Sequence, residues 1–210
     1  MSKDLPIILL RDLENLRAHC STVYSLNFSE EHWELMKGYA QLLYTWSFKL
    51  NLVSPIERDI LGSRHVWRAL SMAPSIYKIP HTNILDVGSG SGIPAIPLKI
   101  CFPEADFYLV ESRRKRTNFL KHVVRTLDLQ KITVINARVE DWSDPLEVDL
   151  VTARSVANPL IIQKWVEGHV HKGSSLVCTL DRRGEILPAG SEERVIEWGK
   201  ESMRLGIIPF

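Results

Sequence analysis

Three alternating glycines and one later glutamate are the residues of this chain whose types and spacing could bind a nucleoside. Gly88, Gly90 and Gly92 directly follow a short apolar run at residues 84–87. Because glycine lacks a Cβ, the backbone there can turn with positive φ and approach a bound molecule closely. The next apolar run ends in Glu111, 23 positions after Gly88. An acidic residue about 20 positions past the first glycine of a Rossmann-like unit binds ribose hydroxyls, so the spacing predicts a nucleoside site.

The form of the glycine turn narrows the choice of nucleoside. It reads G-x-G-x-G rather than G-x-G-x-x-G, and no lysine follows a longer glycine loop. A cradle for a pyrophosphate group is therefore poorly supported. S-adenosylmethionine offers ribose hydroxyls and carries no phosphate, so we expect it as the cofactor in preference to NAD or ATP.

Five short apolar runs predict the strands that position this turn. They alternate with stretches of helical periodicity and lie at residues 84–87, 107–110, 132–135, 149–152 and 176–180. This alternation predicts a Rossmann-like, doubly wound α/β fold with a mainly parallel sheet. The ligand crevice of such a sheet lies at the carboxyl ends of the strands, where Gly88 and Glu111 both stand.

The first 80 residues differ in character and predict a helical cap. Apolar residues recur at helical spacing over residues 5–16, over a longer segment that Ser29 would cap, and over a third segment after Pro55. We therefore predict two units, an N-terminal helical cap at residues 1–80 and a cofactor-binding Rossmann-like domain at residues 81–210.

Composition is typical of a soluble globular protein in a reducing compartment. The chain has 210 residues, of which 45% are hydrophobic and 24% charged, and a net charge of +1. Cys20, Cys101 and Cys178 form no C-x-x-C pair, so we expect buried thiols rather than disulfides, and no metal site. Without an apolar run of about 20 residues or a signal-peptide pattern, the chain is expected to be cytoplasmic and to contact no membrane.

A run of cations directly follows Glu111. Ser112 is predicted to cap a helix that carries Phe119 on its apolar face and arginines and lysines elsewhere. Such a run is often only a solvated helix face. Here four consecutive cations, residues 113–116, stand beside the predicted crevice, which favours a surface for nucleic-acid phosphates. The residues predicted to contact these phosphates are Lys115, Arg116 and Arg138.

Several longer stretches resemble the RsmG family, also called GidB. They read D-V-G-S-G-S-G-I-P-A-I-P-L from residue 86, L-V-E-S-x-x-K-R-x-x-F-L from residue 109, A-R-V-E-D-W from residue 137 and D-L-V-T-A-R-S-V-A from residue 149. Members of this family are bacterial enzymes that methylate N7 of a guanine in small-subunit ribosomal RNA. The resemblance implies a class I methyltransferase fold with an N-terminal helical extension. It also implies S-adenosylmethionine as cofactor and small-subunit ribosomal RNA, or the ribosomal subunit, as partner.

The resemblance further implies which residues bind the cofactor. Gly88 and Ile93 would line the pocket for methionine and adenosine, with Gly90 beside them, and Glu111 would bind the ribose hydroxyls. Val139 and Glu140 would border the adenine, with a backbone group at Val139 reading its edge, and Arg154 would stand at the pocket mouth. The implied cofactor-binding residues are Gly88, Gly90, Ile93, Glu111, Val139, Glu140 and Arg154.

No catalytic acid or base is predicted. Guanine N7 already offers a lone pair, so methyl transfer depends chiefly on holding donor and acceptor in line. His65 and His122 are therefore expected to be structural or surface residues.

The end of the chain departs from the family pattern. Residues 179–184 read T-L-D-R-R-G where the family has a lysine-glycine pair, and residues 192–205 are interpreted as a helix. We therefore expect the strand at residues 176–180 to be an exposed edge of an incomplete sheet, with residues 207–210 as the stub of a sixth strand. The alternative is a tail that folds back and completes a smaller sheet.

Two other functions stay open on this basis. One is a cofactor-binding or RNA-binding homologue that has lost turnover. The other is a Rossmann-like methyltransferase that acts on a small molecule or a protein.

Overall fold

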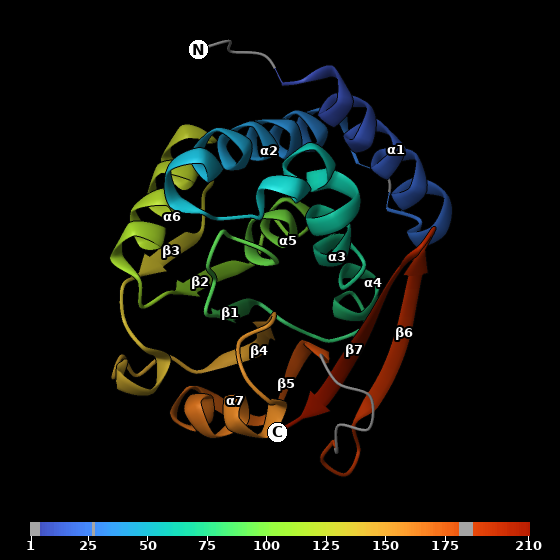
Figure 1. The fold of residues 1–210 in the computed structure, drawn as a ribbon. Coiled ribbons are helices and arrows are strands. Elements are labelled where there is room, and N and C mark those ends of the chain that lie inside the picture. The colour runs from blue at the N-terminus through green and yellow to red at the C-terminus, as the bar shows by residue number, and fades with distance from the viewer. Residues whose placement is uncertain (1–4, 27, 181–186) are drawn as a thin grey trace.

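The chain forms one seven-stranded sheet, and short, largely apolar runs make up β1, β2 and β4 at its centre (Figure 1). This computed structural model describes residues 5–26, 28–180 and 187–210. The strand order is β3-β2-β1-β4-β5-β7-β6, and the first five strands in this order pair in parallel. The predicted α/β fold with a mainly parallel sheet is therefore confirmed. The strands are β1 (Asn83–Val87), β2 (Asp106–Val110), β3 (Ile132–Ile135), β4 (Val148–Ala153), β5 (Val170–Leu180), β6 (Glu192–Trp198) and β7 (Glu201–Pro209).

Side chains alternate between two cores along the strands. Ile84 and Phe107 join the core that contains the N-terminal helices, α5 (Ala95–Cys101) and α6 (Arg114–Thr126). Leu85 and Val110 join the core against α7 (Pro159–Val166). This period of two is the geometry of a strand buried on both faces. The N-terminal helices thus share a core with one face of the sheet, and α7 lies on the other face (Figure 1).

Helices or short helical turns lie between the parallel strands and make up most of the described residues before residue 80. Ser29 caps α2 as predicted, because its Oγ accepts the N–H of His32 at 3.2 Å. None of the described helices is both long enough and apolar enough to cross a membrane. The helices are α1 (Ile7–Tyr24), α2 (Glu30–Leu50), α3 (Trp67–Leu70), α4 (Ala73–Ile76), α5 (Ala95–Cys101), α6 (Arg114–Thr126) and α7 (Pro159–Val166), and short helical turns are η1 (Pro55–Ile60), η2 (Gly62–Val66), η3 (Val139–Asp141) and η4 (Glu167–His169).

The predicted third helix after Pro55 is broken by contact with α1. A 3₁₀ turn, η1, is followed by a π turn, η2, before α3 begins. The carboxylate of Asp12 accepts the N–H of Ser63 at 3.1 Å, and a Cβ on Gly62 would lie 2.7 Å from Asp12 Oδ2. A side chain of α1 therefore takes the place of a regular helical hydrogen bond, which accounts for the irregular turn.

Ser112 does not cap α6, and that prediction is wrong. The helix begins at Arg114, and the residue before it makes no side-chain cap. The N–H of Arg113 instead donates to Glu111 Oε1 at 2.7 Å, and the Thr117 hydroxyl donates to the Glu111 carbonyl at 3.1 Å. Glu111 therefore organises the start of this helix.

The helix predicted over residues 192–205 is also wrong, because this segment forms the hairpin of β6 and β7. Gly199 has φ of 59° at the first of two turn positions, where type II′ hairpin turns need glycine. In β6, the half-buried Arg194, Ile196 and Trp198 alternate with exposed residues. This period of two was the signal that the helical interpretation overlooked.

The fifth strand is not an edge of the sheet. β5 pairs with β4 on one side and with β7 on the other, where Leu176 lies opposite Ile208 and Thr179 opposite Leu205. The expectation of an exposed edge is therefore wrong. The tail folds back as in the alternative expectation, and residues 201–209 insert between β5 and β6.

Candidate functional site

The glycine turn after β1 has the backbone conformation that its sequence predicts. Gly88 and Gly90 have φ of 65° and 56°, in the left-handed region that favours glycine. The N–H of Gly88 donates to the Val110 carbonyl at 2.9 Å, which holds the turn against the end of β2. A Cβ on Gly88 would lie 2.9 Å from Val156 Cγ2, so a larger residue would collide with the loop after β4.

Glu111 connects this turn to the start of α6. It is buried, with 4% of its surface exposed. Its Oε2 accepts the N–H of Gly90 at 2.9 Å and its Oε1 accepts the N–H of Arg113 at 2.7 Å. Because a carboxylate offers about four acceptor positions, both oxygens retain capacity for ribose hydroxyls.

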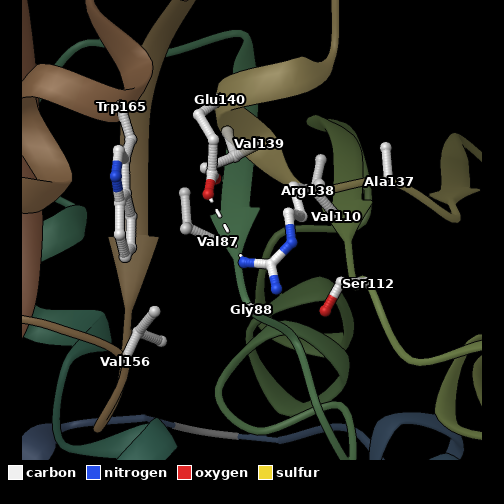
Figure 2. A pocket seen from close by; sticks show the side chains of 10 residues that line it. All are labelled: Val87, Gly88, Val110, Ser112, Ala137, Arg138, Val139, Glu140, Val156 and Trp165. Atoms are coloured by element: carbon white, nitrogen blue, oxygen red, sulfur yellow. Dashed lines mark ion pairs between the residues drawn. The ribbon is translucent and has the colours of Figure 1, made fainter.

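A cavity of about 120 Å³ opens at the carboxyl ends of the first strands. In Figure 2, Trp165 of α7 and Val156 stand on one side, and Ser112 and Ala137 stand on the opposite side. Largely apolar walls with a few polar groups suit a flat heteroaromatic ring such as adenine. The residues that line this cavity are Val87, Gly88, Val110, Ser112, Ala137, Arg138, Val139, Glu140, Val156 and Trp165.

The predicted cofactor residues fall partly at this cavity and partly behind it. Gly88, Val139 and Glu140 line it. Gly90 and Glu111 are joined by their hydrogen bond and do not belong to the lining. Ile93 is buried in the core that contains α5 and α6.

Two arginines line cavities other than those that the sequence predicted for them. Arg138, predicted to contact RNA, lines the same cavity as Gly88, and its Nη1 lies 3.6 Å from Glu140 Oε1 (Figure 2). Arg154, predicted at the mouth of the cofactor pocket, lines a neighbouring cavity together with Arg68.

Sequence reasoning missed several of the cavity walls. Val156 lies in the loop after β4, and the rule that ligands bind at the carboxyl ends of strands could have found it. Trp165 reaches the cavity from α7 through tertiary packing, for which the sequence carries no local signal.

Two of the three residues predicted to contact RNA, Lys115 and Arg116, line a separate, larger cavity. Lys115 and Arg116, with Arg113 and Arg114, face Lys49 at the end of α2 across a cavity of about 500 Å³. None of these five cations forms an ion pair within the described part of the chain. A cationic groove without internal counter-ions suits a polyanion.

Asp86 is a fully buried carboxyl group beside the glycine turn. Its Oδ1 accepts the Thr152 hydroxyl at 2.7 Å, while its Oδ2 has no hydrogen-bond partner in the described structure. Burial raises the pKa of Asp86 to about 6, although the hydrogen bond from Thr152 and the charge of Arg154 oppose the rise. An orphaned carboxylate oxygen of this kind favours a ligand that brings a donor or a positive charge.

Asp86→Asn is expected to remove a pH-dependent loss of stability. Because the folded-state pKa of Asp86 lies above its ordinary value of 3.8, its stabilising contribution is fully present below about pH 4 and is lost as pH rises through about 6. A rise of about two pKa units corresponds to about 3 kcal/mol. Urea unfolding at about pH 4 and about pH 8 should show the variant gaining up to about 3 kcal/mol over the native protein between these values. A stability difference that does not change with pH would show that ionised Asp86 is well solvated or paired.

No group of three or more histidine, cysteine, aspartate or glutamate side chains among the described residues is placed to hold a metal ion.

Comparison with known proteins reveals a family and several relatives. A family model described as rRNA small subunit methyltransferase G, GidB, matches residues 32–186. A ribosomal RNA small subunit methyltransferase G from Lactococcus lactis subsp. cremoris is 31% identical over 163 residues, which cover 74% of this chain and 68% of that protein. The protein of the same name from Staphylococcus aureus is 33% identical over 177 residues, which cover 82% and 71%.

Solved structures of low sequence identity share the fold. TrmN from Thermus thermophilus has a TM-score of 0.50 at 18% identity, covering 68% of this chain and 48% of TrmN. The B. subtilis tRNA methyltransferase TrmK has a TM-score of 0.50 at 16% identity, covering 67% and 64%. The likeness agrees with the expected fold of the class I methyltransferase type.

Proposed function

Because this chain belongs to the GidB family, described as rRNA small subunit methyltransferase G, we propose that it transfers a methyl group from S-adenosylmethionine to N7 of a guanine in small-subunit ribosomal RNA. The observation that carries the proposal is the contiguity of two cavities. Ser112 lines the cavity at the glycine turn, and the next residue, Arg113, begins the lining of the cationic groove. A nucleoside site and a polyanion surface thus meet at one edge of the sheet. A ribosomal partner also implies a cytoplasmic location.

The turn and its surroundings fit S-adenosylmethionine. Gly88 lies where a Cβ would fill the space beside Val156. Glu111 retains acceptor capacity for ribose hydroxyls, and Asp86 Oδ2 is buried without a hydrogen-bond partner among the described residues. We propose as cofactor-binding residues Gly88, Gly90, Ile93, Glu111, Val139, Glu140 and Arg154, and we add Trp165 as a wall of the adenine site.

In this mechanism the protein positions the two reactants, and none of its residues has to transfer a proton. Bound S-adenosylmethionine supplies a methyl group on a positively charged sulfur. Holding a methyl group and guanine N7 in line at near-attack distance can contribute up to roughly 10 kcal/mol. We propose that the glycine turn and the residues around it hold S-adenosylmethionine, and that cationic groups hold the RNA.

The contacts of two histidines support a mechanism without a catalytic base. His65 Nε2 lies 3.3 Å from Glu57 Oε2, and burial lowers the pKa of His65 to about 4. The ring of His122 packs on Trp46, with 5.2 Å between centroids. Neither histidine lines the cavity at the glycine turn.

For the RNA we propose contacts from Lys115, Arg116 and Arg138. Lys115 and Arg116 line the cationic groove, and Arg138 is 68% exposed at the adjoining cavity. Cations so placed would neutralise phosphates of the RNA on both sides of the methylation site.

A homologue that binds its ligands without turnover is the second candidate. It was motivated by an incomplete sheet and by the sequence T-L-D-R-R-G. The hairpin of β6 and β7 removes the first motive, and the departing residues 181–184 lie outside the described part of the chain.

The proposed function predicts radioactive methyl transfer to purified small ribosomal subunits that lack this modification. Mass spectrometry of the digested RNA should then locate the new methyl group on N7 of one guanine. Transfer to a protein or a small molecule would contradict the proposal. Binding of S-adenosylhomocysteine and subunits without transfer would instead support the homologue without turnover.

A further inference from the structure

The last turn of α2 carries an aromatic side chain that the packing of the helix leaves largely in water. Phe48 is 55% exposed, whereas its neighbour Ser47 is fully buried. The next residue, Lys49, lines the cationic groove together with residues 113–116 at the start of α6. The two helices pack against each other here, because the ring of Trp46 contacts that of Phe119. An exposed phenyl ring thus belongs to the same end of α2 as the surface that we propose for RNA.

Two contacts hold the ring of Phe48 in place. The guanidinium carbon of Arg58, in η1, lies 4.1 Å from the ring centroid, and Arg58 Nη2 donates to the Ser47 carbonyl at 2.9 Å. The ring of Tyr44, one helical turn earlier, lies 5.2 Å from that of Phe48 between centroids, at 78° between the planes. A side chain already held in one position loses little conformational freedom when a ligand packs on it.

The charges around Phe48 indicate the chemistry of its partner. Lys49 and Arg58 take part in none of the ion pairs of the described part of the chain. Glu57 pairs with Arg64, so Asp59 is the one exposed carboxylate within residues 48–60, against the five cations of the groove. A nucleic-acid strand offers phosphates and flat bases together. This combination favours RNA over an apolar protein surface as the occupant.

We propose that Phe48 is a stacking platform for an unpaired base of the RNA substrate, next to the phosphates that the cationic groove binds. This inference deepens the proposed function and rests on it. Bases in a duplex are already stacked on their neighbours, and proteins stack aromatic side chains on bases that are splayed out of single strands. The RNA segment that crosses the end of α2 is therefore single-stranded.

The test combines Phe48→Leu with removal of single bases from an RNA probe. Leucine keeps an apolar side chain but has no ring. The probe is a short, labelled single-stranded oligoribonucleotide with one guanosine, made with an abasic site at one position at a time. Native protein should lose about tenfold in affinity at one abasic position, the share of one stacked base. Phe48→Leu should lose about tenfold on the intact probe and nothing further at that position.

Two further measurements separate stacking from a phosphate contact. Phe48→Leu removes no charge, so the log–log slope of affinity against salt concentration should equal that of the native protein. The fluorescent base 2-aminopurine is quenched by stacking, so at the sensitive position it should be quenched by native protein and much less by Phe48→Leu. Phe48→Tyr, which retains a ring, should keep native affinity and quenching.

Tyr77→Leu is the matched control. Tyr77 is 57% exposed and also packs on another ring, that of Phe102 at 4.5 Å between centroids, but it does not line the cationic groove. This variant should bind the intact and the abasic probes as the native protein does. Thermal unfolding by circular dichroism should give native melting temperatures for both leucine variants, because each replaced ring is largely exposed.

Additive losses from Phe48→Leu and every abasic site, or equal losses in Tyr77→Leu, would overturn the proposal. Native binding of the naked probe by Phe48→Leu, with weaker binding of purified small ribosomal subunits, would assign the ring to a protein partner and would also overturn it. Native methyl transfer together with additive losses means that only the stacking platform fails. If native protein transfers no methyl group while the losses are non-additive, the proposed function fails and the platform stands.

Discussion

Gly88→Val is expected to bind S-adenosylhomocysteine about 100-fold more weakly than the native protein. Gly88 has φ of 65°, and its added Cβ would lie 2.9 Å from Val156 Cγ2. A β-branched residue in this backbone region, with a collision against the cavity wall, costs about 3 kcal/mol at the binding site, which corresponds to about 100-fold in affinity. Isothermal titration calorimetry measures the loss directly.

Gly168→Val is the matched control for this substitution. Gly168 lies in η4, directly after α7, and a Cβ there would meet no atom of the described structure within 4 Å. It should bind S-adenosylhomocysteine as the native protein does. Thermal unfolding of both variants by circular dichroism separates loss of the site from loss of the fold. A folded Gly88→Val protein with native affinity would contradict the assignment of the pocket.

The core of the fold was predictable because its signals are local. The central parallel strands β1, β2 and β4 are short, largely apolar runs, and Gly88 stands directly after the first of them. Burial on both faces requires such runs, and the left-handed turn requires glycine, so residue types alone identify both features. The spacing to Glu111 then fixes the acidic group at the neighbouring strand end.

The C-terminal hairpin was predicted wrongly because the apolar residues of β6 fit both the helical spacing of three to four residues and the strand spacing of two. Val195, Ile196 and Trp198 stand at spacings that a helix also permits, and charged residues surround them. What selects strands is the glycine turn at Gly199 and pairing with β5, a partner that is distant in sequence. Pairing of this kind leaves no local signal beyond alternation.

The residues that line the cavities are a second feature that could not be predicted from the sequence. The position of Arg154 after β4 was predicted, yet the cavity that it faces depends on where α3 and β7 pack. Arg68 and Ser202, which come from these elements, are more than 100 positions apart in the chain. Composition and local spacing carry no information on which distant residues come together in the folded chain.

Replacement of Lys115, Arg116 and Arg138 by glutamine is expected to weaken RNA binding at low salt by about two orders of magnitude. If each cation contacts one phosphate, the log–log slope of affinity against salt concentration should fall by about two units on single-stranded RNA. Fluorescence anisotropy with a labelled ribosomal RNA fragment at several salt concentrations measures both quantities. Affinity for S-adenosylhomocysteine separates an RNA effect from damage to the adjoining cavity that Arg138 lines.

A matched triple variant tests whether position or net charge matters. Lys78, Lys131 and Lys172 are exposed cations near the amino ends of β1, β3 and β5, at the opposite edge of the sheet. Their replacement by glutamine changes the net charge by the same amount, so long-range attraction falls equally in both variants. Only the first triple should lower the salt slope strongly, because counter-ion release requires cations that approach phosphates closely. Equal slopes in the two variants would mean that residues 113–116 are a solvated helix face, and the RNA would then have to bind through another surface.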